Sequence, residues 1–183
     1  MSARKTNGTL EFKLILLGKS AVGKTCLVHR YIHNHFEVDT PNDTAGQERF
    51  NAITKFYHRN SNAAIVCVDL TDKESFENMN FWLKQLTNTA TNECELYICC
   101  TKNDLVTKEN IKISSDQIET TANTFKAKVF TTSSKTGEGV HELFRQIIND
   151  LINVELKAEE QTIKLTKDEL KKKKLSKICC KIK

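Results

Sequence analysis

The stretch Gly18-Lys-Ser-Ala-Val-Gly-Lys-Thr25 decides the fold, because it fits the pattern G-x-x-x-x-G-K-[ST]. It follows an apolar run of strand length at 11–17 and precedes a helix expected at 26–35. Glycines in such a loop let backbone N–H groups point at phosphate oxygens, while the lysine reaches the β- and γ-phosphates and the hydroxyl ligates Mg²⁺. The alternative is a glycine-containing turn with an incidental lysine. The strand–loop–helix context favours a nucleotide-phosphate loop, with expected contacts from Gly18, Ser20, Ala21, Val22, Gly23, Lys24, Thr25 and Cys26.

Strands and helices are expected to alternate along the rest of the chain. Apolar runs of strand length lie at 63–69 and 95–101, with a shorter run at 129–132. Nearly continuous apolar runs are typical of strands that are covered on both faces, as in parallel sheets. Helical periodicity lies between them, with expected capping boxes at Thr71/Glu74 and Ser114/Gln117, and an apolar stripe runs from 140 to 152. The class is therefore α/β, with a mostly parallel sheet flanked by helices.

The charge is unevenly distributed over the 183 residues, whose net charge is +5. Residues 164–183 carry nine lysines and two acidic residues, so the remainder of the chain has a net charge of −2. A mildly acidic body argues against a nucleic-acid-binding fold, and the basic segment points to an anionic partner. We expect an N-terminal arm (1–10), one domain (11–155) and a basic tail (156–183).

Apolar residues are too dispersed for a membrane span, which needs roughly 20 in succession. The mean hydropathy is −0.45. The first ten residues have no apolar core of a secretory signal, so the seven cysteines are expected to stay reduced. These features predict a protein of the cytoplasm.

A second polar motif, Asp43-Thr-Ala-Gly-Gln-Glu-Arg-Phe50, follows the phosphate loop. Asp43 can hold a Mg²⁺-bound water, the Gly46 amide can sense a γ-phosphate, and Gln47 can orient the attacking water. Taken alone, the motif is also compatible with a polar turn. After a phosphate loop it predicts a nucleotide switch.

Two further motifs follow predicted strands, where open α/β sheets bind ligands. In Thr101-Lys-Asn-Asp104, the Asp104 carboxylate can accept two N–H bonds from a guanine edge, and Lys102 can lie over the base. In Ser133-Ser134-Lys135, a backbone N–H can reach the guanine oxygen. Each motif is weak alone, but together they predict a guanine site.

With these residues in place, the chain resembles the Ras superfamily, and within it the Rab family, over residues 10–155. The resemblance extends through AGQERF at 45–50, KFYHRNSNAAIVCVDLTDKESF at 55–76 and the adjacent Cys179-Cys180. The sequences RYIHNHFEV and TSSKTGEGVHELF, and a base motif that begins with Thr, are most similar to the atypical, autophagy-associated subgroup. The resemblance implies a guanine-nucleotide switch in vesicle traffic, with a six-stranded sheet, five flanking helices and one antiparallel edge strand.

The resemblance also implies roles for single residues. Gln47 and Lys24 would be catalytic, Thr25 and Asp43 would hold Mg²⁺, and Phe36 would stack on the base. Lys102, Asp104, Ser133, Ser134 and Lys135 would bind the base of GTP or GDP. The implied partners are escort and prenylation proteins, a GDP dissociation inhibitor, exchange factors and effectors. No nucleic-acid partner is expected, and we expect a monomer on the cytosolic face of intracellular membranes, endosomal or autophagosomal.

Two departures from the family pattern stand out. Thr101 replaces an Asn whose amide ties the base loop to the phosphate loop, so weaker nucleotide binding is expected. Only 17 residues separate Thr25 from Asp43, and after the first helix this leaves residues 36–42 where the family has a switch loop and two strands. Two such strands with their connections need roughly twenty residues. The second and third family strands, and the switch Thr that ligates Mg²⁺, are therefore expected to be missing.

This gap has two explanations: a transcript or gene model that skips a coding segment, or a natural short form with altered switching. Either way, the first strand is expected to be an exposed apolar edge, prone to pairing or aggregation. The functional hypotheses are a Rab-type GTPase with impaired hydrolysis, a membrane-anchored nucleotide binder that does not switch, and a truncated product.

The basic tail surrounds Cys179 and Cys180 with lysines. Two lipids, or one lipid with basic residues, anchor a protein stably to an anionic membrane. A solvated lysine-rich tail is the alternative. The resemblance implies geranylgeranyl attachment at Cys179 and Cys180.

Overall fold

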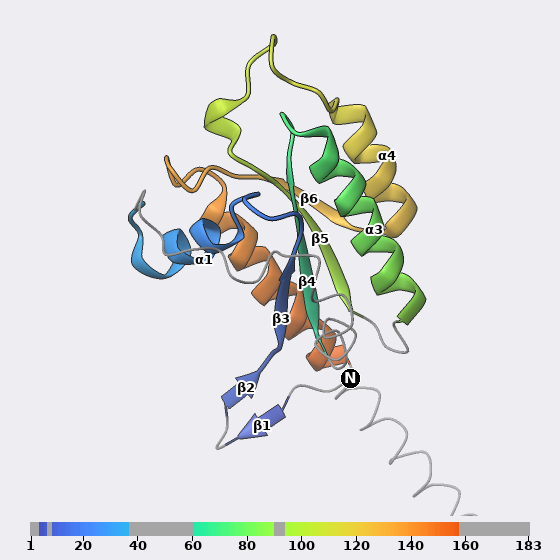
Figure 1. Cartoon of the computed structure of the whole chain (residues 1–183). Helices are drawn as coiled ribbons and strands as arrows, with labels where there is room; N and C mark the ends of the chain where they lie inside the picture. The colour runs from blue at the N-terminus through green and yellow to red at the C-terminus, as the bar shows by residue number, and fades with distance from the viewer. Residues whose placement is uncertain (1–3, 7–8, 37–60, 90–93, 158–183) are drawn as a thin grey trace, which may run out of the picture.

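The computed structural model describes residues 4–6, 9–36, 61–89 and 94–157. Its centre is a parallel four-stranded sheet in the order β3-β4-β5-β6, shown in Figure 1. The strands are β3 (Leu14–Leu17), β4 (Ala63–Asp69), β5 (Glu95–Thr101) and β6 (Lys128–Thr131). The predicted α/β class with a parallel sheet is confirmed.

The two central strands are buried as their apolar sequences predict. All seven residues of β4 and six of the seven in β5 are buried, because helices cover both faces of the sheet. The pairing is in register along the whole of both strands, from Ala63 opposite Glu95 to Asp69 opposite Thr101. Both strands therefore end at the same level, and this places their following loops side by side.

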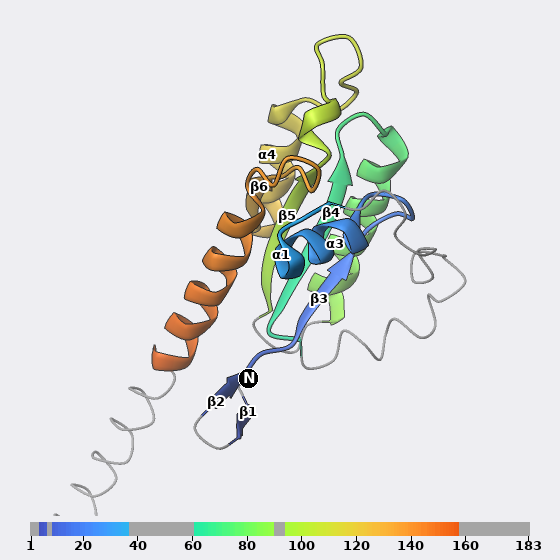
Figure 2. The same ribbon diagram turned by 90° about the vertical axis from the view of Figure 1, so that its left-hand side faces the viewer.

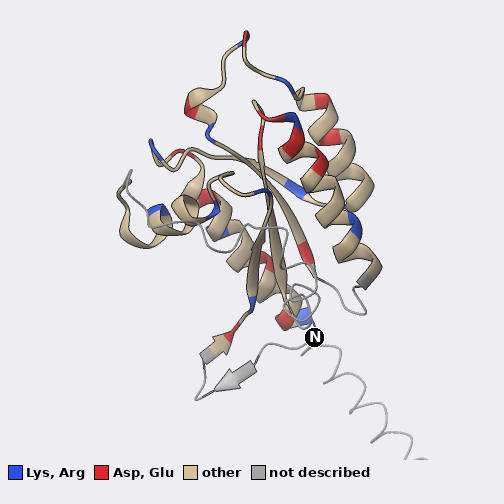
Figure 3. Ribbon diagram, viewed as in Figure 1, with Lys and Arg blue, Asp and Glu red and all other residues tan. Residues whose placement is uncertain are grey.

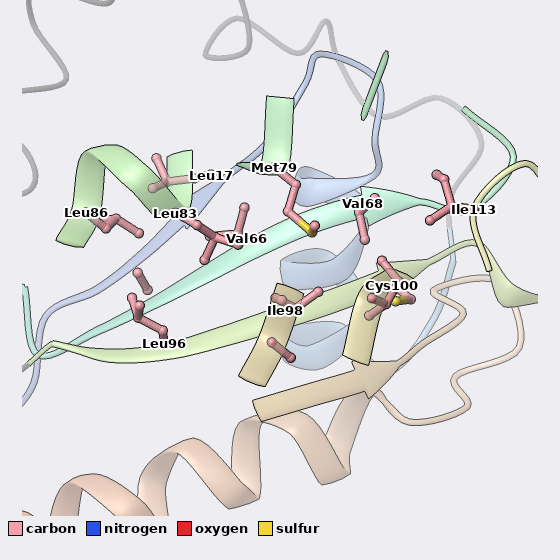
Figure 4. Packing of buried hydrophobic residues seen from close by; sticks show 13 residues of the cluster. Leu17, Val66, Val68, Met79, Leu83, Leu86, Leu96, Ile98, Cys100 and Ile113 are labelled. Atoms are coloured by element: carbon pink, nitrogen blue, oxygen red, sulfur yellow. The ribbon is translucent and has the colours of Figure 1, made fainter. Parts of the chain in front are cut away.

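Helices form a layer on each face of the sheet, as Figures 1 and 2 show. One layer consists of α3 (Lys73–Thr89) and α4 (Ser115–Phe125). The other consists of α1 (Lys24–His33) and a C-terminal helix at 140–157. The core under α3 and α4, drawn in Figure 4, joins strand residues such as Val66 and Ile98 to Met79 and Leu83 of α3.

Of the two predicted capping boxes, one forms and one does not. The capping box at Ser114 and Gln117 is confirmed. The one at Thr71 is wrong, because α3 begins at Lys73 and the Asp72 carboxylate accepts a 3.0 Å hydrogen bond from the Glu74 N–H. Thr71 instead donates its own N–H and hydroxyl to Asp69.

Helix α1 was expected at 26–35 but begins two residues earlier, at the lysine of the phosphate loop. Its N-cap is Gly23, with φ 99°, and no side chain caps the helix. The usual Ser, Thr, Asp or Asn start signal is therefore absent from the sequence. At the other end, Asn34 adopts φ 56° and closes the helix.

An antiparallel hairpin of β1 (Arg4–Thr6) and β2 (Thr9–Glu11) precedes β3 and was not predicted. The predicted strand at 11–17 is correspondingly shorter, and Glu11 belongs to β2. The connecting sequence Asn7-Gly8 is the residue pair that two-residue hairpin loops favour, so a signal was present.

Within the described ranges, β3 lies at one edge of the sheet. Its residues Leu14, Ile15 and Leu16 are half-buried and Leu17 is buried, so the edge is apolar but less exposed than expected. The expected loss of a strand pair at 36–42 and the basic tail fall mostly outside the described residues. No helix in the described part of the chain is long and apolar enough to cross a membrane.

Candidate functional site

The carboxyl ends of the parallel strands bring three predicted motifs together. The phosphate loop follows β3, the 101–104 motif ends β5, and the 133–135 motif follows β6. Direct hydrogen bonds join them, including one from the Asn103 N–H to the Thr132 carbonyl oxygen at 3.1 Å. This edge is where open α/β sheets place ligands.

The phosphate loop has a backbone that most residues cannot adopt. Gly18 has φ 136°, and a Cβ atom there would lie only 2.6 Å from the Cys67 carbonyl oxygen. Ala21 adopts the left-handed region with φ 61°, and Gly23 follows with φ 99°. Left-handed residues between right-handed ones turn successive N–H groups toward one point, which creates an anion-binding concavity.

Lys24 lies over this concavity at the first position of α1. Its Nζ donates to the Gly18 carbonyl oxygen at 3.0 Å and to the Lys19 carbonyl oxygen at 2.8 Å. The residue is only 8% exposed. The positive charge therefore lies at the N-terminal end of a helix, a combination that favours bound phosphate. Thr25, the predicted Mg²⁺ ligand, is exposed beside it.

Lys19, inside the phosphate loop, makes ion pairs that the sequence did not predict. Its Nζ lies 2.8 Å from Asp72 Oδ2 and 2.6 Å from Glu74 Oε2. These hydrogen bonds raise the pKa of Lys19. Figure 3 shows the acidic residues at the start of α3. The contact ties the loop after β3 to the loop after β4.

Thr101 joins the base motif to the phosphate loop, despite the expected weakness of a hydroxyl at this position. Its Oγ1 donates to the Val22 carbonyl oxygen at 2.7 Å and lies 3.1 Å from the Val68 carbonyl oxygen. Thr101 is only 2% exposed. A short hydroxyl suffices because the two loops lie in direct contact.

Lys102, the predicted base-stacking lysine, is held by Asp69 at the end of β4. The Lys102 Nζ lies 2.9 Å from Asp69 Oδ2. Burial acts to raise the pKa of Asp69, but hydrogen bonds from Thr71 and Lys102 outweigh it, and the net pKa is below the usual value. Asp69 therefore remains charged and fixes the lysine stem beside the base motif.

Asp104 and the 133–135 motif are also linked. The Ser133 hydroxyl donates to Asp104 Oδ1 at 2.6 Å and accepts from the Thr136 N–H at 3.1 Å. Ser133 is fully buried, whereas Asp104 is exposed. The carboxylate is thus held at the surface, and its other oxygen accepts no hydrogen bond from the described residues.

Of the remaining predicted site residues, Phe36 lies at the boundary of the described part of the chain and the others lie outside it. Phe36, just beyond α1, is 38% exposed. Asp43, Gly46 and Gln47 lie outside the described residues, as do Cys179 and Cys180.

Comparison with known proteins agrees with this geometry. The model of the Ras family matches residues 13–42 and 40–153. The chain is 40% identical over 169 residues to Ras-related protein Rab-24 of Dictyostelium discoideum, covering 79% of this chain and 83% of that protein. It is 36% identical over 167 residues to Ras-related protein Rab-21 of Bos taurus, with 79% and 74% covered. Ras-related protein Rab-13 of Rattus norvegicus is 33% identical over 164 residues, with 77% and 80% covered.

The family match is interrupted where the sequence is short. Its two segments meet at residues 40–42. The alignment with Rab-24 spans 169 positions and covers 79% of the 183 residues of this chain, which is about 145 residues. Roughly 24 alignment positions are therefore gaps in this chain. A segment about as long as two strands with their loops is therefore absent relative to these proteins.

Proposed function

This chain belongs to the Rab small GTPases of the Ras family, and on that premise we propose that its 18–25, 101–104 and 133–135 loops bind GTP and GDP. As a Rab protein it is a GTP-hydrolysing enzyme of membrane traffic, which acts with Rab regulators and effectors. The main support for this nucleotide site is that the three loops contact one another at one edge of the sheet, through Thr101, Asn103 and Asp104.

The phosphate loop contributes positive charge and fixed N–H dipoles to the proposed reaction. Phosphoryl transfer depends mainly on positioning and charge neutralisation, which Lys24 and the loop N–H groups would supply. Gln47 would orient the attacking water. Thr25 and Asp43 offer the hard oxygen ligands that Mg²⁺ prefers, and the ion would neutralise phosphate charge.

Selection of guanine is proposed for the base loops. Asp104 would accept the N1–H and the 2-amino group of guanine, while adenine presents an unprotonated N1 that repels the carboxylate. Within the described ranges, the N–H groups of Ser134 and Lys135 donate to no protein acceptor. They are therefore available for the guanine O6. Lys102 would cover the base, and Phe36 would stack against it.

Impaired hydrolysis is part of the proposal. The two segments of the family match meet at residues 40–42, between Thr25 and Asp43, where the resemblance places the switch Thr that ligates Mg²⁺. We therefore place the missing segment there. Without this ligand and the surrounding loop, the γ-phosphate site stays open to bulk water, which weakens electrostatic stabilisation. A membrane-anchored nucleotide binder that does not switch, or a truncated product, is the second candidate, favoured by the same missing segment.

Membrane attachment is proposed through geranylgeranyl groups on Cys179 and Cys180, assisted by the lysines of residues 164–183. Two anchoring signals of this kind give stable binding to an anionic cytosolic leaflet. Similarity to Rab-24 and the Thr at the start of the base motif support an autophagy-related compartment.

Analysis of the copurifying nucleotide tests the proposed function. The full chain is purified in Mg²⁺, denatured, and its released nucleotide is identified by chromatography. We expect GDP or GTP from the wild-type chain and none from Lys24→Met, whereas Lys84→Met, an exposed lysine of α3, should behave as wild type. Folded protein that never carries guanine nucleotide contradicts the proposal, and aggregated, empty protein supports the truncated product.

A further inference from the structure

The side chain of Arg30 reaches from α1 to the loop after β6, which lies 104 residues away in sequence. Its Nε donates to the Ser134 carbonyl oxygen at 2.7 Å, and its Nη2 donates to the Lys135 carbonyl oxygen at 2.5 Å. Its Nη1 donates to the Asn34 carbonyl oxygen at 2.8 Å, which holds the guanidinium from its own helix. One planar, permanently charged group therefore fixes two consecutive carbonyls.

Fixing a carbonyl also fixes the N–H of the same peptide group, because the peptide bond is planar and trans. The Ser134 carbonyl shares its peptide with the Lys135 N–H, which must point away from Arg30. A cation at a carbonyl oxygen also polarises the peptide, which strengthens its N–H as a donor. Within the described ranges, neither this N–H nor that of Ser134 donates to a protein acceptor.

The loop after β6 lies against the guanidinium. Gly137 has φ 91°, and a Cβ atom there would lie 3.4 Å from Arg30 Nε. The Gly137 N–H donates to the Ser133 carbonyl oxygen at 2.7 Å, which closes the turn beside the guanidinium. On the other side, the Ser133 hydroxyl holds Asp104. The loop is thus fixed between Arg30 and Asp104.

We propose that Arg30 is a positioning residue for guanine recognition, which holds the Ser134–Lys135 peptide so that its N–H donates to the guanine O6. The inference rests on the proposed function and deepens it. Arg30 does not touch the base in this arrangement. Arg30 acts through the Ser134–Lys135 peptide, so its replacement should weaken only the binding of bases that carry an oxygen at position 6.

The test compares three diphosphates that differ at single atoms of the base. GDP has the O6 acceptor, 6-thio-GDP replaces it with sulfur, a weaker acceptor, and IDP keeps O6 but lacks the 2-amino group. Their dissociation constants are measured on the full chain as wild type, Arg30→Met, Arg30→Lys and Arg145→Met. Arg145 is an exposed arginine of the C-terminal helix and serves as the matched control.

We expect Arg30→Met to weaken the binding of GDP and IDP by about tenfold and the binding of 6-thio-GDP by no more than about twofold. The reason is that one hydrogen bond is lost only where O6 is present. Arg30→Lys should show the same pattern with a smaller loss, and it keeps the test decisive if Arg30→Met does not fold. Arg145→Met should bind all three as wild type does.

Equal weakening of GDP and 6-thio-GDP in both Arg30 variants overturns the inference, because it indicates a general tie between α1 and the loop. Unchanged GDP binding in both variants overturns it as well. A wild-type chain that folds but binds no guanine nucleotide is a different failure, which removes the proposed function and this inference with it.

Discussion

The hydroxyl of Thr101 donates a hydrogen bond to the carbonyl oxygen of Val22 at 2.7 Å, and this bond links the base loop to the phosphate loop. Both residues are about 2% exposed. In a buried position the acceptor has no water to replace the hydroxyl, so its loss leaves a carbonyl unpaired. The bond is therefore expected to control the relative position of the two halves of the nucleotide site.

Replacement of Thr101 by Val should test this link, because Val keeps the shape and removes the hydroxyl. We expect GDP to bind about fivefold to tenfold more weakly, corresponding to about 1 kcal/mol. The GDP dissociation rate measures the effect. Thr124→Val, which removes a hydroxyl bonded within α4 at an exposed position, should leave that rate unchanged. Equal effects of the two substitutions would contradict the role of Thr101.

Gly139 precedes the C-terminal helix with φ 69°, and a Cβ atom there would lie 2.1 Å from the Thr131 carbonyl oxygen. Gly139→Ala should therefore lower the free energy of unfolding by about 2 kcal/mol or more, through backbone strain and the clash. Denaturant unfolding measures the change. The exposed neighbour Glu138→Ala is the control and should change stability by less than about 0.5 kcal/mol. A tolerated alanine at 139 would contradict the geometry.

Asp150 on the C-terminal helix accepts from Lys128 Nζ at 2.6 Å and from the Tyr97 hydroxyl at 2.7 Å. Burial acts to raise the pKa of Asp150, but hydrogen bonds from Lys128, Tyr97 and Gln146 outweigh it, so the folded pKa lies below the usual value. The stabilisation from Asp150 is therefore present above the unfolded pKa of about 3.9 and is lost as the pH falls through the lower folded pKa.

Asp150→Asn should accordingly be less stable than wild type at pH 7, by about 0.5–1 kcal/mol. The difference should shrink as the pH falls below about 4, because the wild-type carboxylate is then protonated as well. Denaturant unfolding between pH 7 and pH 3 measures it. Glu119→Gln, at an exposed position of α4, should show no such trend. A difference that stays constant down to pH 3 would disprove this linkage.

Hydrolysis of GTP should be slow because this chain lacks a segment that is present in Rab-24. Insertion of the corresponding Rab-24 positions at residues 40–42 should raise Mg²⁺-dependent single-turnover hydrolysis by at least about tenfold, since the restored loop supplies charge stabilisation. An insertion of equal length made of Gly and Ser is the control. Wild-type turnover already equal to that of the insertion variant would refute the impairment. Gln47→Leu should slow hydrolysis in the insertion variant.

Isoprenoid labelling in cells tests the proposed tail modification. The wild-type chain should incorporate an isoprenoid analogue and sediment with membranes, because lipid and lysines together give stable binding. The Cys179→Ser/Cys180→Ser double variant should lose the label and remain in the supernatant. Ser176→Ala, in the same basic segment, should behave as wild type. Label retained by the double variant would rule out these cysteines as the attachment site.

The elements that the sequence predicted best are those with one dominant local signal. The strands β4 and β5 are continuous apolar runs, and α4 has a complete capping box, so their positions follow from residues close together in the chain. The start of α1 was missed because Gly23 caps it through its backbone conformation and no side chain does. The hairpin of β1 and β2 was not predicted, although the sequence Asn7-Gly8 is typical of a two-residue hairpin loop.

By itself, the sequence determined the α/β class, the Rab family and the motifs whose chemistry suits a guanine nucleotide, because each depends on residue types at short, fixed spacing. Only the tertiary structure decided what holds those motifs in place. The contacts of Arg30 with Ser134 and of Lys19 with Asp72 join residues 104 and 53 positions apart. No local pattern encodes such pairs, because they form only when parallel strands bring their carboxyl ends to the same edge of the sheet.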